Sequence, residues 1–193
     1  MHRLNNALGI EFYNSAPQPA NAYSISSLKV AAFEANLEQD CLDYYYNAVC
    51  TFAEAINGLK NGSFAWATVQ LYYSSFYSAR SILGANSIAI LYEKSKPFSL
   101  KILPNSSPKR ETGNTHEVAF KIINRELTIP EFAQPIDGKP PFDWLKEKRE
   151  EANYKLAKIY DPNMPTRRVR IVILPSNRGH SFKHSSGPRR LAG

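Results

Sequence analysis

Residues 63–84 constrain the fold most, because apolar side chains occur on almost every side of this stretch at helical spacing. One row contains Trp66, Val69, Tyr73, Phe76, Arg80 and Leu83, and a second contains Tyr72, Ser75, Ala79 and Ile82. A helix that is apolar all round is buried among other elements. Ser63 is a suitable N-cap residue and Gly84, with Asn86 after it, is a suitable stop. The sequence therefore predicts a central helix with partners on both faces.

Arg80 is the exception in the first of these rows, where its neighbours are aromatic or aliphatic. An unpaired guanidinium is costly to bury, so Arg80 must meet a carboxylate, carbonyl groups, water or a ligand phosphate. Two interpretations stay open: a structural arginine with a protein partner near the end of the helix, or a ligand for nucleic-acid phosphate.

The composition is that of an ordinary globular chain, since 43% of the 193 residues are apolar and 21% are charged. No window approaches 18 uninterrupted apolar residues, and residues 1–20 lack an apolar core of signal-peptide length. These features predict a cytoplasmic protein without a membrane partner. Cys41 and Cys50 fall on opposite sides of one predicted helix and offer neither a disulfide nor zinc-ligand spacing, so we expect no metal and no cofactor.

The net charge of +7 is concentrated in the C-terminal segment, residues 162–193. This segment has seven Lys or Arg residues and no Asp or Glu, and its first arginines are Arg167, Arg168 and Arg170. A basic arm of this kind can bind the phosphate backbone of a nucleic acid. The alternative is a disordered tail without a role in binding, although residues 166–175 alternate enough to be a short strand.

The rest of the chain divides into an N-terminal arm, residues 1–25, and a helical bundle, residues 26–161. The first long helix is expected at residues 27–60, with a core-facing row spaced by three and four: Leu28, Ala31, Ala35, Glu38, Leu42, Tyr45, Val49, Phe52, Ile56 and Leu59. Asn61-Gly62 ends this helix, so it forms an antiparallel hairpin with the central one. The hairpin is the first half of a mainly α, up-and-down four-helix bundle.

A β-like insertion is expected at residues 87–103, between the second and third helices, because short apolar runs replace the helical pattern there. Residues 104–113 have loop composition and contain Lys109 and Arg110, which we expect to be exposed and available to nucleic acid. Asn114 and Glu117 form a capping-box pattern that opens a third helix at residues 115–127. His116 lies in its first turn, where we expect a surface or capping residue more than a catalyst, although an auxiliary role stays open.

The last helix is expected at residues 142–160, after a proline-rich irregular crossing at residues 128–141. Its apolar row contains Arg149, the second arginine in such a place. Asn153 shares the face of Arg149, whereas Tyr154 is rotated by about 140° in a regular helix. No glycine-rich phosphate loop, nucleophile elbow or paired metal-ligand motif is present.

Two of these segments together resemble HEPN (higher eukaryotes and prokaryotes nucleotide-binding) domains. The central helix, QLYYSSFYSARSILGAN at Gln70–Asn86, resembles the "AYYAxFHAARALL" helix of that superfamily. The last helix, WLKEKREEANY at Trp144–Tyr154, resembles its "LRxxREKADY" ending, in the same order and at a similar separation. The resemblance covers residues 26–160 if the helical architecture is included.

The resemblance implies an up-and-down bundle that dimerises and binds or cleaves RNA in a bacterial toxin–antitoxin or antiphage defence system. It aligns Arg149 with the arginine of the family's metal-independent Arg-x4-6-His motif, but the histidine position falls at Tyr154 or its neighbours. Tyrosine is a poor base at neutral pH, so catalysis stays open. The candidate catalytic residues are Arg149, Asn153 and Tyr154, and Arg80 from the neighbouring helix is a candidate nucleic-acid ligand.

Two functions follow from these observations. The first is an RNA-binding or RNase-type protein that holds RNA phosphate in a helix-lined groove of a homodimer, with an antitoxin or another defence protein as a further partner. The aromatic surplus of the central helix favours such a dimer. The alternative is a non-catalytic bundle that acts as an adaptor or assembly subunit, in which Arg80 and Arg149 pair with carboxylates such as Glu38, Glu150 or Glu151.

Overall fold

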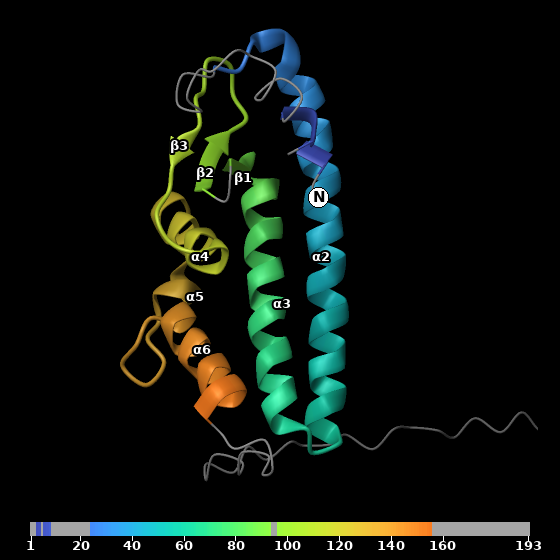
Figure 1. Cartoon of the computed structure of the whole chain (residues 1–193), viewed down its shortest axis with the longest axis vertical. Coiled ribbons are helices and arrows are strands. Elements are labelled where there is room, and N and C mark those ends of the chain that lie inside the picture. The colour runs from blue at the N-terminus through green and yellow to red at the C-terminus, as the bar shows by residue number, and fades with distance from the viewer. Residues whose placement is uncertain (1–2, 5, 9–23, 94–95, 156–193) are drawn as a thin grey trace, which may run out of the picture. The chain divides into compact units, whose positions relative to one another are not determined.

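The computed structural model describes residues 3–4, 6–8, 24–93 and 96–155 (Figure 1). This part of the chain is mostly helical and carries a small antiparallel sheet, which confirms the mainly α class and the β insertion. Two long helices come first, α2 at Val30–Lys60, preceded by a 3-10 turn at Ser27–Lys29, and α3 at Phe64–Ala85. The other helices are α4 at Thr115–Glu126, α5 at Pro130–Ala133 and α6 at Pro141–Glu150.

Helices α2 and α3 lie side by side (Figure 1). They pack closely through small residues. A Cβ atom added at Gly84 would lie 3.0 Å from the Cβ of Cys41, so glycine permits this approach. The hydroxyl of Ser74 donates to the carbonyl of Ala48 at 2.9 Å, and that of Ser81 donates to the carbonyl of Cys41 at 3.1 Å. These bonds between side chain and backbone require short side chains on both helices.

The predicted core-facing row of α2 is wrong. The side chains buried on α2 are Phe33, Leu37, Asp40, Ala48 and Ala55, whereas Leu42, Tyr45, Val49 and Phe52 are about half exposed or more. The face of α2 with small residues is the buried one, because small side chains let the axes of α2 and α3 approach and bury backbone as well as side chains. The larger apolar residues are left on the opposite face.

The insertion forms a three-stranded antiparallel sheet in the order β1 (Ile88–Glu93), β2 (Lys96–Lys101) and β3 (Lys109–Arg110). Strand β3 lies in the segment predicted to be a loop. Ile88 and Ile90 of β1 belong to a cluster with α3 and α4, and Ala89 and Leu91 belong to a second cluster with the start of α2. Strand β1 is therefore buried on both faces, which explains its continuous apolar run.

Residues 3–4 and 6–8 are helical and pack on the start of α2. Leu4 and Leu8 are buried, and Asp40 accepts hydrogen bonds from the backbone N–H groups of Arg3 and Leu4 at 2.9 and 3.1 Å. These residues of the predicted N-terminal arm therefore form a short helical element laid on the bundle, and residues 9–23 of the arm lie outside the described residues.

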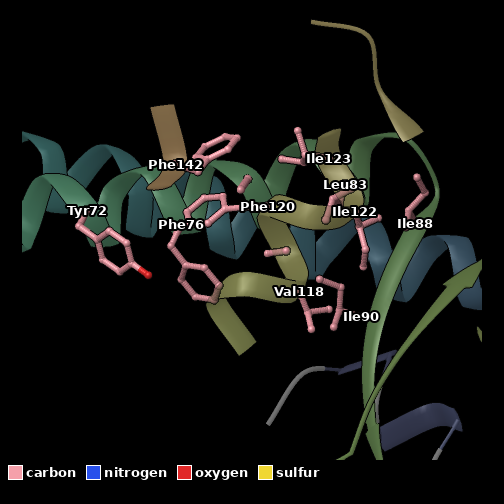
Figure 2. Packing of buried hydrophobic residues seen from close by; sticks show 12 residues of the cluster. Tyr72, Phe76, Leu83, Ile88, Ile90, Val118, Phe120, Ile122, Ile123 and Phe142 are labelled. Carbon is pink, nitrogen blue, oxygen red and sulfur yellow. The ribbon is translucent and has the colours of Figure 1, made fainter. Parts of the chain in front are cut away.

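Helices α4 and α6 pack on α3, which thus has partners on both sides as predicted. Figure 2 shows the cluster that joins them. Its aromatic contacts include Phe120 of α4 and Phe142 of α6, whose rings stack at 4.0 Å. The predicted capping box of α4 is present, but Ser63 makes no capping hydrogen bond at the start of α3.

A polar network joins α4 to the sheet. Arg125 donates to both carboxylate oxygens of Glu111, at 2.8 and 3.1 Å, and the hydroxyl of Ser99 donates to the same carboxylate at 2.6 Å. Lys101 and Arg125 also each contact Glu126 at 2.8 Å, and their hydrogen bonds lower the pKa of Glu126 to about 2. This network joins the C-terminal end of α4, and Glu111 before α4, to strand β2.

The last helix departs from the prediction in one respect. Regular α-helix ends at Glu150, and residues Glu151–Lys155 form a π-helical turn. The predicted continuation at residues 156–160 lies outside the described residues, as do the segment 162–193 and its predicted strand. The proline-rich crossing contains the short helix α5, which begins at Pro130.

Candidate nucleic-acid interface

Arg149 lies at the end of α6, with its guanidinium over the ring of Tyr72 from α3. The carbon Cζ is 4.9 Å from the centre of that ring, a distance typical of a cation–π contact. The side chain is 18% exposed. Its nearest carboxylate, that of Glu150, lies 3.8 Å from Nη2, and the buried Nε atom has no hydrogen-bond partner. Arg149 is thus held by an aromatic ring and retains unused donor capacity.

His116 reaches the same aromatic group from the first turn of α4. Its ring centre lies 4.1 Å from that of Phe76, 5.4 Å from that of Tyr72 and 5.5 Å from that of Tyr73. Burial lowers the pKa of His116 below its usual value of 6.5, and the positive charge of Arg149 lowers it further. The Nδ1 atom is buried without a hydrogen-bond partner. The expectation of a surface or capping histidine is therefore wrong, because this imidazole is half-buried and neutral.

Tyr72 is the residue that connects the two candidate side chains, Arg149 and His116. It is 1% exposed, and burial raises the pKa of its hydroxyl, although the adjacent guanidinium of Arg149 opposes that shift. Its ring contacts both Arg149 and His116, so residues from α3, α4 and α6 meet at this point. We call Tyr72, His116 and Arg149 the Arg–His site.

An ion pair fixes the spacing between α4 and α6 beside this site. Lys146 contacts Glu117 at 2.5 Å, and this hydrogen bond is the main reason why the pKa of Glu117 is lowered. Glu117 also completes the capping box by accepting from the backbone N–H of Asn114 at 3.2 Å. The residues flanking His116 are therefore held by α6 as well as by their own helix.

Asn153 and Tyr154, the other predicted catalytic residues, lie in the π-helical turn after Arg149. Asn153 is half-buried, whereas Tyr154 is 76% exposed. The ring of Tyr154 therefore does not pack into the site, and the structure supplies an imidazole from α4 instead.

Arg80 is enclosed elsewhere in the fold. It is 7% exposed, lies 4.8 Å from the ring centre of Tyr44 on α2, and donates to the carbonyl of Ile90 on β1 at 3.5 Å. Burial raises the pKa of Tyr44 to about 12, although the charge of Arg80 opposes that shift. The adjoining cavity of about 20 Å³ has room for one water and not for a phosphate group. Arg80 thus takes the structural role that the sequence left open.

The remaining predicted nucleic-acid ligands do not belong to the Arg–His site. Lys109 and Arg110 are exposed on β3, paired with Ser99 and Phe98 of β2. Arg167, Arg168 and Arg170 lie outside the described residues. The sequence does not indicate Tyr72 as a site residue, because its contacts with α4 and α6 depend on tertiary packing.

No protein-family model, curated protein or solved structure matches the chain. None of the helices in the described part of the chain is long and apolar enough to cross a membrane. Within the same residues, no group of three or more His, Cys, Asp and Glu side chains could hold a metal ion. The inference about function therefore depends on the geometry of the Arg–His site and on the two motif resemblances.

Proposed function

We propose that this protein is a HEPN-like, RNA-binding endoribonuclease of a toxin–antitoxin or antiphage defence system, built as an up-and-down four-helix bundle. The observation that carries the proposal is the meeting of Arg149 and His116 on one tyrosine ring. The resemblance places Arg149 in the family's motif but offers no histidine after it. In this chain a histidine from another helix contacts the same tyrosine ring as the arginine.

Arg149 is suited to hold an RNA phosphate. A guanidinium binds phosphate through two parallel N–H donors, and the half-exposed carboxylate of Glu150 at 3.8 Å is a weak competitor for them. The ring of Tyr72 fixes the plane of the guanidinium before RNA binds. This preorganisation lowers the entropy that binding must otherwise overcome.

His116 is suited to act as the base because burial and Arg149 keep it neutral. In the proposed step, the imidazole accepts the proton of a ribose 2′-hydroxyl, and the oxygen attacks the adjacent phosphorus. The bond to the 5′-oxygen breaks, that oxygen takes a proton from water, and a 2′,3′-cyclic phosphate remains. Because Nδ1 is buried, the proposed step assigns the proton to Nε2. Arg149 stabilises the negative charge that develops on the phosphorane.

The adaptor alternative is favoured by one observation, the contact of Arg149 with Glu150, which this alternative also predicts. The two functions differ in what Arg149 contributes. A phosphate ligand contributes to RNA affinity, whereas a structural arginine contributes to the stability of the fold.

Substitution of Arg149 separates these contributions. We expect Arg149→Ala to weaken binding of a labelled single-stranded RNA by about 10–100-fold, the effect of losing a charged hydrogen-bonding group. The melting temperature should fall only modestly, because the lost cation–π contact at this largely buried position contributes about 2 kcal/mol, less than the loss of a partner from a buried ion pair, about 3–5 kcal/mol. Fluorescence anisotropy and thermal unfolding measure the two quantities.

Two further variants serve as controls. Lys148→Ala removes one positive charge from the same helix and should reduce affinity only slightly. Arg149→Lys keeps the charge but loses the planar fork, so affinity should fall if the phosphate contact is bidentate. RNA affinity that is unchanged in Arg149→Ala, or a large loss of stability in that variant, would favour the adaptor function.

A further inference from the structure

The outer face of α2 carries a continuous apolar row. Its central members, Leu42, Tyr45, Val49 and Phe52, are 48–61% exposed, and the adjacent Tyr46 is 69% exposed. Helix α3 covers the opposite, small-residue face of α2, and α4 and α6 pack on the far side of α3 (Figure 1). No described element covers these five residues, which we call the α2 row.

The spacing of this row is that of a helix–helix seam. The positions that share the outer face, separated alternately by three and four residues, are Ala35, Glu38, Leu42, Tyr45, Val49, Phe52 and Ile56. A repeat of 3.5 residues sustained along a helix keeps one stripe facing a second helix when the two helices wind gently around each other. A helix with a solvated outer face has no physical reason to maintain this spacing in large apolar residues.

The composition of the row is also that of an interface core. Residues 44–53 include no charged side chain, and Asp43 and Glu54 flank them. The exposed parts of the five side chains amount to roughly 500 Å² per copy, or about 1,000 Å² for a symmetric pair, which is near the lower limit for a specific interface. Uncharged aromatic residues at the centre with charges at the margin match the usual anatomy of such contacts.

We propose that the α2 row is the interface of a homodimer in which α2 pairs antiparallel with α2 of a second copy. The row is symmetric about a point between Tyr45 and Val49. In a two-fold arrangement Leu42 therefore faces Phe52, and Tyr45 faces Val49, of the other copy. The same register sets Glu34 opposite Lys60, both of which are exposed. Charge complementarity at both ends of the seam favours a second copy over an unrelated partner.

This pairing has a consequence for RNA binding. Helix α2 lies on the side of α3 away from α4 and α6, so the Arg–His site of each copy lies clear of the proposed interface. The dimer interface and the RNA site are then separate surfaces, in contrast to the groove between copies that the family resemblance implies. The proposal does not depend on RNA binding and is tested without it.

Analytical ultracentrifugation of the full chain tests the proposal. We expect a dimer, and we expect Leu42→Glu or Val49→Glu to raise its dissociation constant by more than about a hundredfold, because each places two unpaired carboxylates in the seam. Leu103→Glu is the matched control, since Leu103 is 50% exposed but lies after β2. It should leave the dimer intact. Circular dichroism should show that all three variants keep the helical fold, because each substituted side chain is exposed in the single copy.

A charge exchange tests the antiparallel register. Glu34→Lys should weaken the dimer, and the double variant Glu34→Lys with Lys60→Glu should restore it. A wild-type chain that stays monomeric at high micromolar concentration would overturn the proposal. The α2 row would then be a surface for the chain's own C-terminal residues or for a different protein. A dimer that withstands both Leu42→Glu and Val49→Glu would overturn the proposal equally.

Discussion

At the scale of single residues, the proposed function depends on two side chains held in unusual states. The guanidinium of Arg149 lies over the ring of Tyr72, and its contact with the carboxylate of Glu150 is long. His116 lies among the rings of Phe76, Tyr72 and Tyr73, where burial favours its neutral form. The identity of Arg149 as a candidate could be predicted, because it interrupts an apolar row. The role of His116 could not, since a histidine in the first turn of a helix is a surface residue unless another helix covers it.

The neutral state of His116 predicts how stability depends on pH. The groups that face its ring are Arg149 from α6 and the aromatic residues of α3. Its pKa is about 6.5 in the unfolded chain and lower in the folded protein. Between these two values the unfolded chain binds more protons, so the free energy of unfolding should fall as pH falls below about 6.5.

Substitution by phenylalanine isolates this contribution. His116→Phe keeps an aromatic ring without a titrating group, so its stability should depend less on pH between 7 and 5. Chemical denaturation at a series of pH values measures the difference between the two proteins. The lowered pKa values of Glu117 and Glu126 act at lower pH, below the usual 4.5, and do not overlap with this window. Identical pH profiles for the two proteins would show that His116 is not held neutral.

At the scale of elements, α2 shows what periodicity can and cannot establish. The approximate bounds of α2 and α3 and the hairpin between them could be predicted, because Asn61-Gly62 and Gly84 with Asn86 mark where the helices end, although Ser63 makes no capping hydrogen bond. The buried face of α2 could not, since periodicity identifies a stripe without stating what lies against it. Large residues such as Tyr45 and Phe52 suggested the core, but Ala48 and Ala55 allow closer approach to α3.

The close approach of α2 and α3 predicts opposite effects for one substitution at two glycines. Gly84→Ala brings a Cβ to 3.0 Å from that of Cys41, so it should destabilise the protein by about 1–2 kcal/mol. Gly58→Ala finds its nearest neighbour, the Cβ of Ala67, at 3.4 Å and should be neutral or stabilise by up to about 1 kcal/mol. Urea unfolding of both variants measures the effects. A Gly84→Ala protein that is as stable as wild type would contradict the close packing of α2 against α3.

At the scale of the whole molecule, α3 separates two surfaces with different proposed roles. Its small residues hold α2, whose outer row is proposed to join two copies, and its aromatic residues hold α4 and α6, which bring His116 and Arg149 together. The sequence predicted a central helix with partners on both sides. It could not predict which residues of distant segments would meet, because that depends on tertiary packing.

Cleavage of a defined RNA tests the central claim most directly. In the presence of EDTA, the wild-type protein should cut a labelled single-stranded RNA and leave 2′,3′-cyclic phosphate ends, and it should not cut the same sequence with 2′-deoxyribose. Arg149→Ala and His116→Phe should each reduce the rate by at least about 100-fold while remaining folded, because each removes a group that acts in the proposed step. Absence of cleavage by the wild-type protein, or an unchanged rate in folded His116→Phe, would contradict the proposed site.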